Sequence, residues 1–163
     1  METKEICKWL MKRAAMHYLF NKSRKIIRWV FENGTYKQIT LISQNNGGFR
    51  LSQTENSFDD FVNNSGGLVI VLFTRERNEI QTEFNFEDEG KRLQEKYPEQ
   101  INFGIVYIVD KDVPVFVNKF PSIIIFKEGK ELSKREGNMT KKAIQLYFKE
   151  IITEYLERGD REG

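Results

Sequence analysis

The chain has 163 residues, of which 39% are hydrophobic and 13% aromatic, enough to bury one core but too few for two comfortable domains. It holds one cysteine, Cys7, and one histidine, His17, so an intramolecular disulfide is excluded and a Cys/His metal site is disfavoured. No apolar run approaches the roughly 20 residues that span a bilayer. We therefore expect a soluble or peripheral protein.

The net charge of +2 conceals an uneven distribution of charged residues. Residues 1–50 carry 10 Lys and Arg against 3 Asp and Glu, whereas residues 51–163 carry 16 against 21. The basic part at the start of the chain is therefore a candidate for contact with phosphate groups. Its candidate residues are Lys8, Lys12, Arg13, Lys22, Arg24, Lys25 and Arg28.

Residues 4–20 predict an amphipathic helix, because apolar side chains recur there every three or four positions. This apolar stripe includes Cys7, so the thiol is expected on the buried side of the helix. The segment fits packing on the domain, an organelle presequence, a membrane-surface helix or a phosphate-binding arm. It does not fit a secretory signal, and the compartment stays open between cytoplasm, nucleus and an organelle.

Residues 26–31 and 35–42 predict a β-hairpin, because Asn33-Gly34 between two β-rich runs is a strong hairpin signal. A loop and a short strand over residues 49–52 follow. We assign residues 1–48 to an N-terminal extension made of the helix and this hairpin, and residues 49–163 to the main domain. The hairpin is expected as an added edge or a docking element outside the core.

Three short, uninterrupted apolar runs predict interior strands that are covered on both faces. They occupy residues 68–73, 103–109 and 123–126. Pro121 comes just before the last run, and a proline there belongs at the first position of the strand. Glu128-Gly129-Lys130 predicts a hairpin turn into a further strand over residues 131–136. The connector over residues 110–116 has room for a single turn.

Three helices are expected within the main domain. Residues 57–62 predict a short helix with Ser57 at its N-cap, and residues 79–97 predict a long one. A kink near Asn85 and a solvated charged face are expected in the long helix. The clearest apolar stripe runs from Ile144 to Tyr155, with Asn138 or Thr140 as the capping residue.

The element order over residues 57–155 resembles that of thioredoxins. The similarity rests on a strand ending in Val-Asp, then Val-x-x-Phe-Pro-Ser at residues 117–122, four apolar residues, and Phe-Lys-Glu-Gly-Lys at residues 126–130. The resemblance implies an α/β thioredoxin-like fold, a mixed central sheet with helices on both faces, here with the N-terminal helix and hairpin added. It also implies that Pro121 is a cis-proline that faces the functional site and precedes Ser122.

The dithiol motif of thioredoxins is absent from the corresponding position. Thioredoxins carry Trp-Cys-Gly-Pro-Cys there, and the chemistry needs one cysteine to attack and a second to resolve the mixed disulfide. Counting from Phe73 places Asn78 and Gln81 at the two cysteine positions, whereas counting back from Tyr97 shifts the register by two residues, and neither register contains a cysteine. An amide cannot accept electrons from a disulfide. Dithiol catalysis is therefore excluded by composition, and we expect neither enzymatic activity nor a cofactor or metal.

The first functional hypothesis is a redox-inactive thioredoxin-like module that binds protein as an adaptor or assembly subunit. Backbone groups before the cis-proline offer β-type pairing to an extended peptide without any thiol. Arg75 and Arg77 would favour an acidic partner. The expected contact residues are Thr74, Arg75, Glu76, Arg77, Asn78, Phe120, Pro121 and Ser122.

Two alternative functions use the N-terminal segment. Residues 103–116 also resemble the thioredoxin-like subunit of the spliceosome, which suggests an RNA-associated subunit of a ribonucleoprotein complex that binds through the basic segment. The other alternative is a thiol-disulfide oxidoreductase that acts through Cys7 alone. A glutathione-type mechanism needs its cysteine at a helix start facing the proline, and Cys7 is far from that position in the sequence.

Overall fold

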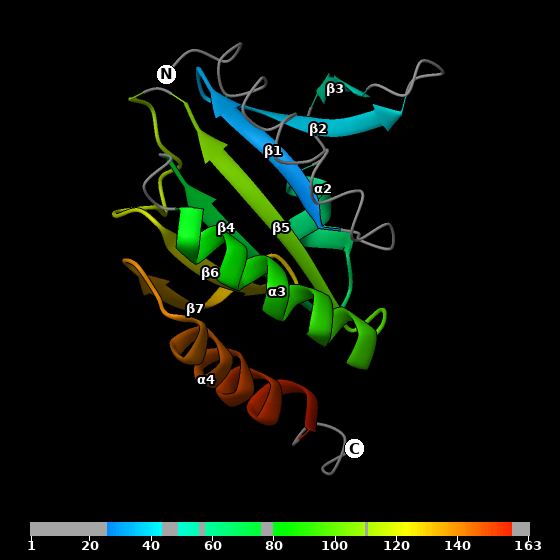
Figure 1. Cartoon of the computed structure of the whole chain (residues 1–163), viewed down its shortest axis with the longest axis vertical. Helices are drawn as coiled ribbons and strands as arrows, with labels where there is room; N and C mark the ends of the chain where they lie inside the picture. The colour runs from blue at the N-terminus through cyan, green and yellow to red at the C-terminus, as the bar shows by residue number, and fades with distance from the viewer. Residues whose placement is uncertain (1–25, 44–48, 56–57, 76–79, 110, 158–163) are drawn as a thin grey trace.

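The structure, a computed structural model, describes residues 26–43, 49–55, 58–75, 80–109 and 111–157 (Figure 1). Its strands are β1 (Ile27–Glu32), β2 (Thr35–Ser43), β3 (Phe49–Glu55), β4 (Leu68–Thr74), β5 (Ile101–Ile108), β6 (Ser122–Lys127) and β7 (Lys130–Glu136). Its helices are α2 (Phe58–Asn64), α3 (Ile80–Lys96) and α4 (Lys141–Ile152), the last followed by a π-helical turn η2 (Thr153–Glu157). The N-terminal helix expected over residues 4–20 lies outside the described residues.

The described strands form one mixed sheet in the order β3-β2-β1-β5-β4-β6-β7. The pairs β1–β5 and β4–β5 are parallel, and the remaining pairs are antiparallel. Helix α3 connects the parallel strands β4 and β5, as such a crossover requires. The sheet thus combines a parallel centre with an antiparallel hairpin at each side.

Side chains of the central strands divide the core into two layers. In β4, Leu68, Ile70 and Leu72 pack on the face that carries α3 and α4, beside buried residues of both helices. Val69, Val71 and Phe73 belong to the cluster on the opposite face, which contains Phe58, Phe61 and Val62 of α2. Figure 1 shows α3 and α4 on the near face of the sheet, with α2 behind it. The predicted burial of these strands on both faces is confirmed.

The predicted β1–β2 hairpin is present, but its first strand lies inside the sheet rather than at an added edge. Asn33 and Gly34 have φ values of 52° and 74°, the left-handed conformation that a tight hairpin turn needs. Strand β1 pairs with β5 on its other side, and Trp29 and Val30 have no exposed surface. The boundary expected at residue 48 falls between β2 and β3, two paired strands of the same sheet.

Helix α3 differs from the prediction in two ways. It runs without a break from Ile80 to Lys96, because the Asn85 amide donates to the Met139 carbonyl oxygen at 3.3 Å instead of capping a second segment. Its charged residues are not all solvated, since Glu83, Glu87 and Glu89 are at most 3% exposed. Periodicity does not reveal this burial, because it depends on neighbours from β1 and α4.

The C-terminal part of the chain follows the predictions closely. The Val117 amide donates to the Pro114 carbonyl oxygen at 3.0 Å, which closes the single turn expected in the connector. Glu128 and Gly129 form the predicted hairpin turn, and the Thr140 hydroxyl accepts a hydrogen bond from the Ala143 amide at 3.1 Å as the N-cap of α4. Within the described ranges, no helix is long and apolar enough to cross a membrane.

Candidate functional site

The predicted site lies where β4 ends and β6 begins. Phe73 pairs with Ser122 across these antiparallel strands, so the end of β4 and the segment before Pro121 are neighbours. Thr74 is 4% exposed and Ser122 is fully buried, and the Ser122 hydroxyl donates to the Lys119 carbonyl oxygen. The Phe120–Pro121 bond is cis, and the Pro121 carbonyl oxygen accepts from the Gly137 amide at 2.8 Å. The Pro121 segment is therefore fixed from both sides.

Arg75 and Phe120 form the exposed part of this junction. The guanidinium carbon of Arg75 lies 4.7 Å from the centroid of the Phe120 ring, within the range of a cation–π contact. Both side chains are half-buried. The structure thus brings together Thr74, Arg75, Phe120, Pro121 and Ser122. The predicted contact residues Glu76, Arg77 and Asn78 lie outside the described residues.

The connector before Pro121 exposes apolar side chains. Val115 is 98% exposed and Val113 is 39% exposed, whereas Val117 is buried. Phe116 is half-buried, and its ring makes edge-on contacts with Phe73 at 5.4 Å and with Phe126 at 5.9 Å between centroids. The connector is therefore anchored by Phe116 and Val117 while it presents Val115 to solvent. The sequence predicted a single turn in this connector but did not single out Val115 as exposed.

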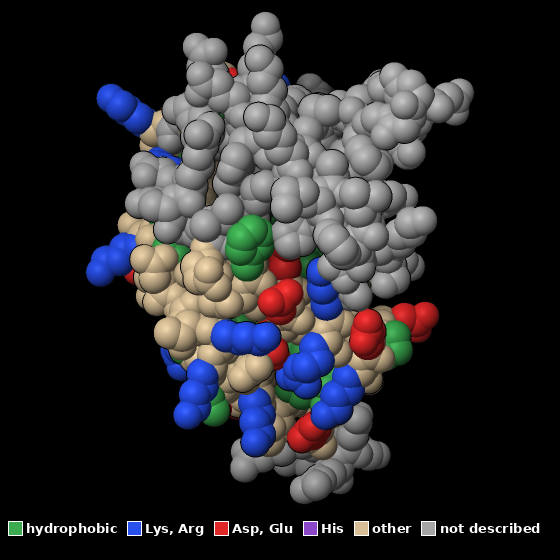
Figure 2. Space-filling view, in the orientation of Figure 1, with side chains coloured by type: hydrophobic (Ala, Val, Ile, Leu, Met, Phe, Trp, Pro, Cys, Tyr) green, Lys and Arg blue, Asp and Glu red, His purple; other side chains and the backbone are tan. Residues whose placement is uncertain are grey.

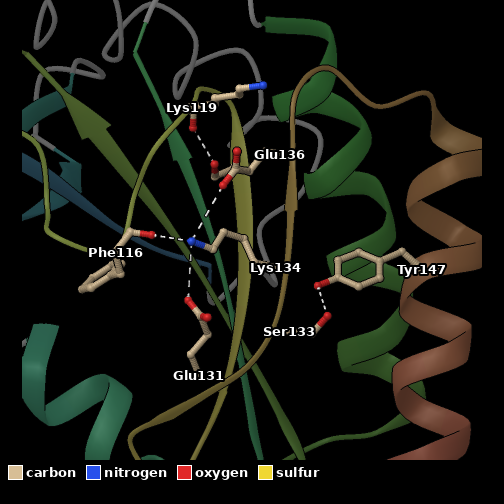
Figure 3. Close-up of polar contacts among 8 residues, drawn as sticks. Phe116, Lys119, Glu131, Ser133, Lys134, Glu136 and Tyr147 are labelled. Carbon is tan, nitrogen blue, oxygen red and sulfur yellow. Dashed lines mark hydrogen bonds and ion pairs between the residues drawn. The ribbon is translucent and has the colours of Figure 1, made fainter.

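Lys134 of β7 holds this connector in place (Figure 3). Its ammonium group donates to the Phe116 carbonyl oxygen at 2.9 Å and lies 3.9 Å from a Glu131 oxygen and 3.7 Å from a Glu136 oxygen. Because the Lys134 side chain is only 21% exposed, these contacts are partly shielded from water. No sequence signal identified Lys134, since a lysine in an edge strand ordinarily serves solubility.

The geometry at this junction suits backbone recognition. Among the hydrogen bonds of the described residues, none uses the Phe120 amide or carbonyl group. A backbone donor and acceptor next to the start of a strand are the groups with which an extended peptide pairs in β-strand addition. Within the described part of the chain, no cluster of three His, Cys, Asp or Glu residues is arranged to hold a metal. Cys7 lies outside that part.

Of the predicted phosphate-binding residues, only Arg28 lies within the part of the chain that the structure describes. Its guanidinium donates to a carboxylate oxygen of the buried Glu87 and to the Ile26 carbonyl oxygen at 3.3 Å. Burial opposes the charge, but attraction to Glu87 and Tyr107 raises the pKa of Arg28 above its ordinary value. A phosphate contact at Arg28 would have to compete with Glu87. Lys8, Lys12, Arg13, Lys22, Arg24 and Lys25 lie outside the described residues.

The topology places the chain in the thioredoxin-like fold class. The β4-α3-β5 crossover, the antiparallel β6–β7 hairpin, the proline at the entry to β6 and the closing helix α4 follow the order that the sequence resemblance implied. The two faces of the mixed sheet carry helices, as that resemblance also implied. Strands β2 and β3 extend this arrangement on one side of the sheet.

Comparison with known proteins finds similarity among solved structures alone: no protein-family model matches the sequence, and no curated protein matches it. Zinc-bound human ERp44 has a TM-score of 0.49 and 20% identity, covering 60% of this chain and 30% of that one. Thioredoxin Mala s 13 of Malassezia sympodialis has a TM-score of 0.47 and 16% identity, covering 78% and 91%. A designed protein has a TM-score of 0.43 and 14% identity.

Proposed function

We propose that this chain is a protein-binding module that recognises an extended peptide beside Pro121 and exchanges no disulfides. It would serve as an adaptor or assembly subunit. The observation that supports this most directly is the Phe120 backbone, whose amide and carbonyl groups make no hydrogen bond among the described residues. A peptide strand that pairs with them would gain directional hydrogen bonds that require no thiol.

The side chains around Phe120 define the peptide that this site would prefer. The Phe120 ring and the exposed Val115 on the same connector offer apolar contact. Arg75 contributes a positive charge beside the ring, which favours a carboxylate on the bound peptide. The preferred ligand is therefore an extended segment with one apolar and one acidic side chain.

The cysteine content of the chain argues against disulfide exchange. Attack and resolution at a disulfide need two thiols or one thiol and an external partner, and Cys7 is the single cysteine of the chain. We expect the intact chain and its Cys7→Ser variant to show the same background rate of insulin reduction and of glutathione-disulfide exchange. A higher rate in the intact chain would identify Cys7 as a working thiol and contradict the proposal.

A direct test of this proposal uses the alternating direction of backbone amides along a bound β-strand. An array of acidic and apolar peptides is screened with the labelled intact chain, and the strongest binder is resynthesised with one backbone amide methylated at a time. Because successive amides of a strand point to opposite sides, methylation should weaken binding at every second position near the contact. Each sensitive position should lose about fivefold in affinity, the value of one hydrogen bond. Equal sensitivity at neighbouring positions, or none, would exclude β-type pairing.

Val115→Asp provides a second arm of this test. It replaces an exposed apolar side chain, so the fold should be retained while affinity for apolar peptides falls. The control is Lys130→Asp, which changes an exposed residue at the start of β7. If both variants bind the array peptide as the unmodified chain does, the connector is not part of the site.

A further inference from the structure

Strand β7 contains a β-bulge that changes the direction of its side chains. Ser133 pairs with Ile125 of β6, and Glu131 pairs with the next residue, Phe126, so Leu132 is an extra residue between the two pairs. Side chains of a regular strand alternate between the two faces of the sheet. Because of the extra residue, Glu131 lies on the face of Phe126 instead of the face of Ser133.

The bulge brings three charged side chains to the face of the sheet that carries α2. Lys134 pairs with Ile124, and Glu131 with Phe126, and both of these apolar partners belong to the cluster on that face. Glu136, two residues after Lys134, lies on the same face. A strand without the bulge would direct Glu131 to the opposite face, where it could not approach Lys134.

The connector before Pro121 packs over this same face. The Phe116 ring contacts the apolar cluster of the α2 face, and its carbonyl oxygen accepts from the Lys134 ammonium group at 2.9 Å. Carboxylate oxygens of Glu131 and Glu136 lie 3.9 Å and 3.7 Å from that ammonium group (Figure 3). The two carboxylates and the carbonyl oxygen together fix where the ammonium group lies. We call these groups, with Lys134, the Lys134 cluster.

Lys134 differs from the lysines of the solvated surface. Figure 2 shows basic and acidic side chains intermixed over α3 and α4, where water screens their charges. Lys134 lies on the other face of the sheet, is partly buried and donates to a main-chain oxygen outside its own strand. A charge-assisted hydrogen bond with restricted access to water is stronger than a contact at the open surface. The Lys134 cluster is therefore a specific link between β7 and the connector.

This link fixes the backbone next to the exposed Val115. Phe116, whose carbonyl oxygen accepts from Lys134, directly follows Val115. The Val117 amide donates to the Pro114 carbonyl oxygen at 3.0 Å, which closes the turn around Val115. Val115 therefore projects from a short turn whose backbone is held by β7. An apolar side chain on a fixed backbone loses little conformational freedom when a partner covers it.

We propose that Lys134 is a positioning residue of the peptide site beside Pro121, an inference that rests on the function proposed above. Phe116 lies four residues before Phe120, at most about 14 Å of extended chain. The position of the Phe116 carbonyl group therefore limits how far Val115 can lie from a peptide paired with the Phe120 backbone. Lys134 acts through Val115: it holds the connector where Val115 contacts the apolar side chain of the peptide, without a peptide contact of its own.

A positioning role and a purely structural role of Lys134 make different predictions. If the hydrogen bond to Phe116 only stabilises the fold, its loss changes the affinity of every bound peptide by the same factor. If it positions Val115, the loss falls on peptides whose apolar side chain contacts Val115 and spares those that lack this side chain. Selectivity among peptides, and not stability, is thus the quantity to measure.

The test uses the intact chain, the strongest binder of the peptide array, and an analogue of that binder with alanine in place of its apolar residue. Lys134→Met should weaken the parent peptide about fivefold and change the alanine analogue less than about twofold. Lys134→Arg keeps a cationic donor, so most of the affinity for the parent peptide should be retained. Lys130→Met makes the same chemical change at the exposed start of β7 and should bind both peptides as the unmodified chain does.

A double-mutant cycle with Val115→Ala identifies the path of the effect. Lys134→Met should add little to the loss that Val115→Ala causes alone, because one change already removes what the other positions. Additive losses, or equal losses of both peptides, would overturn the positioning role. If the array binder shows the alternating amide pattern but Lys134→Met leaves its affinity unchanged, the peptide site stands and the positioning role falls. If no array peptide binds the unmodified chain, the peptide site is excluded, and with it the role of Lys134.

Discussion

The guanidinium carbon of Arg75 lies 4.7 Å from the centroid of the Phe120 ring and joins the end of β4 to the residue before Pro121. Phe73 and Ser122 form the last pair of the β4–β6 ladder next to this contact, so the half-buried cation and ring lie at the end of two paired strands of the sheet. A partner that approaches the Phe120 backbone therefore meets a preformed surface, which lowers the ordering cost of binding.

The Arg75–Phe120 contact should be measurable as a coupling energy. In a double-mutant cycle with Arg75→Gln and Phe120→Leu, we expect the two changes to be non-additive by about 0.5–1 kcal/mol in the free energy of unfolding. Urea unfolding of the four proteins gives the value. Strict additivity would mean that the cation and the ring contribute independently of each other.

Lys134 should control the order of the connector. Lys134→Met keeps the aliphatic stem but removes the hydrogen bond to the Phe116 carbonyl oxygen, so we expect a loss of about 1 kcal/mol in unfolding free energy. The Val117 amide, which closes the Pro114 turn, should exchange its hydrogen faster. Lys130→Met, at an exposed position of the same strand, is the control. Unchanged exchange at Val117 would show that Phe116 and its ring contacts anchor the connector without Lys134.

Gly104 should tolerate no side chain. A Cβ atom there would lie 2.8 Å from Cζ3 of Trp29 and 3.1 Å from Cε1 of Phe61, inside the fully packed layer beneath α2. We expect Gly104→Ala to cost about 1–3 kcal/mol through overpacking. Gly90→Ala is the matched comparison, because its Cβ would lie 3.3 Å from the Phe103 ring while alanine gains about 1 kcal/mol in helix propensity. Equal losses at both positions would contradict this account of the packing.

Two tyrosines with raised pKa values should make the fold less stable in alkaline solution. Burial, and secondarily the charge of Asp59, raises the pKa of Tyr36, and burial raises that of Tyr147. Because the folded pKa exceeds the unfolded value, their contribution is complete below about pH 10 and is lost as the pH rises further. Tyr36→Phe with Tyr147→Phe should therefore flatten the alkaline part of the stability curve. Urea unfolding across this pH range checks it, and parallel curves for the two proteins would refute it.

Local patterns predicted most of the elements. The uncharged run in β4, the Asn33-Gly34 turn and the Thr140 cap all depend on neighbours in the sequence, and the structure has them at the expected places. The position of β1 inside the sheet could not be predicted from such local patterns. Its parallel pairing with β5 joins distant segments, and a hairpin signal does not reveal what lies on the outer side of its first strand.

The candidate site shows the same division between local and long-range information. Pro121, Phe120 and Arg75 were predicted from the thioredoxin resemblance, and the structure brings them together. Lys134 was missed because its carbonyl partner belongs to a different element. The burial of Glu89 was missed for a related reason: its partner Gln145 belongs to α4, and charge alone predicted exposure.

Hydrogen exchange of the intact chain with its strongest array peptide tests the central claim most directly. The account predicts slower exchange at the Phe120 amide and at the amides of Thr74 and Arg75, with the same protection in the Cys7→Ser variant. Protection confined to other parts of the chain, or binding that disappears when Cys7 is replaced, would show that recognition does not occur through the backbone beside Pro121.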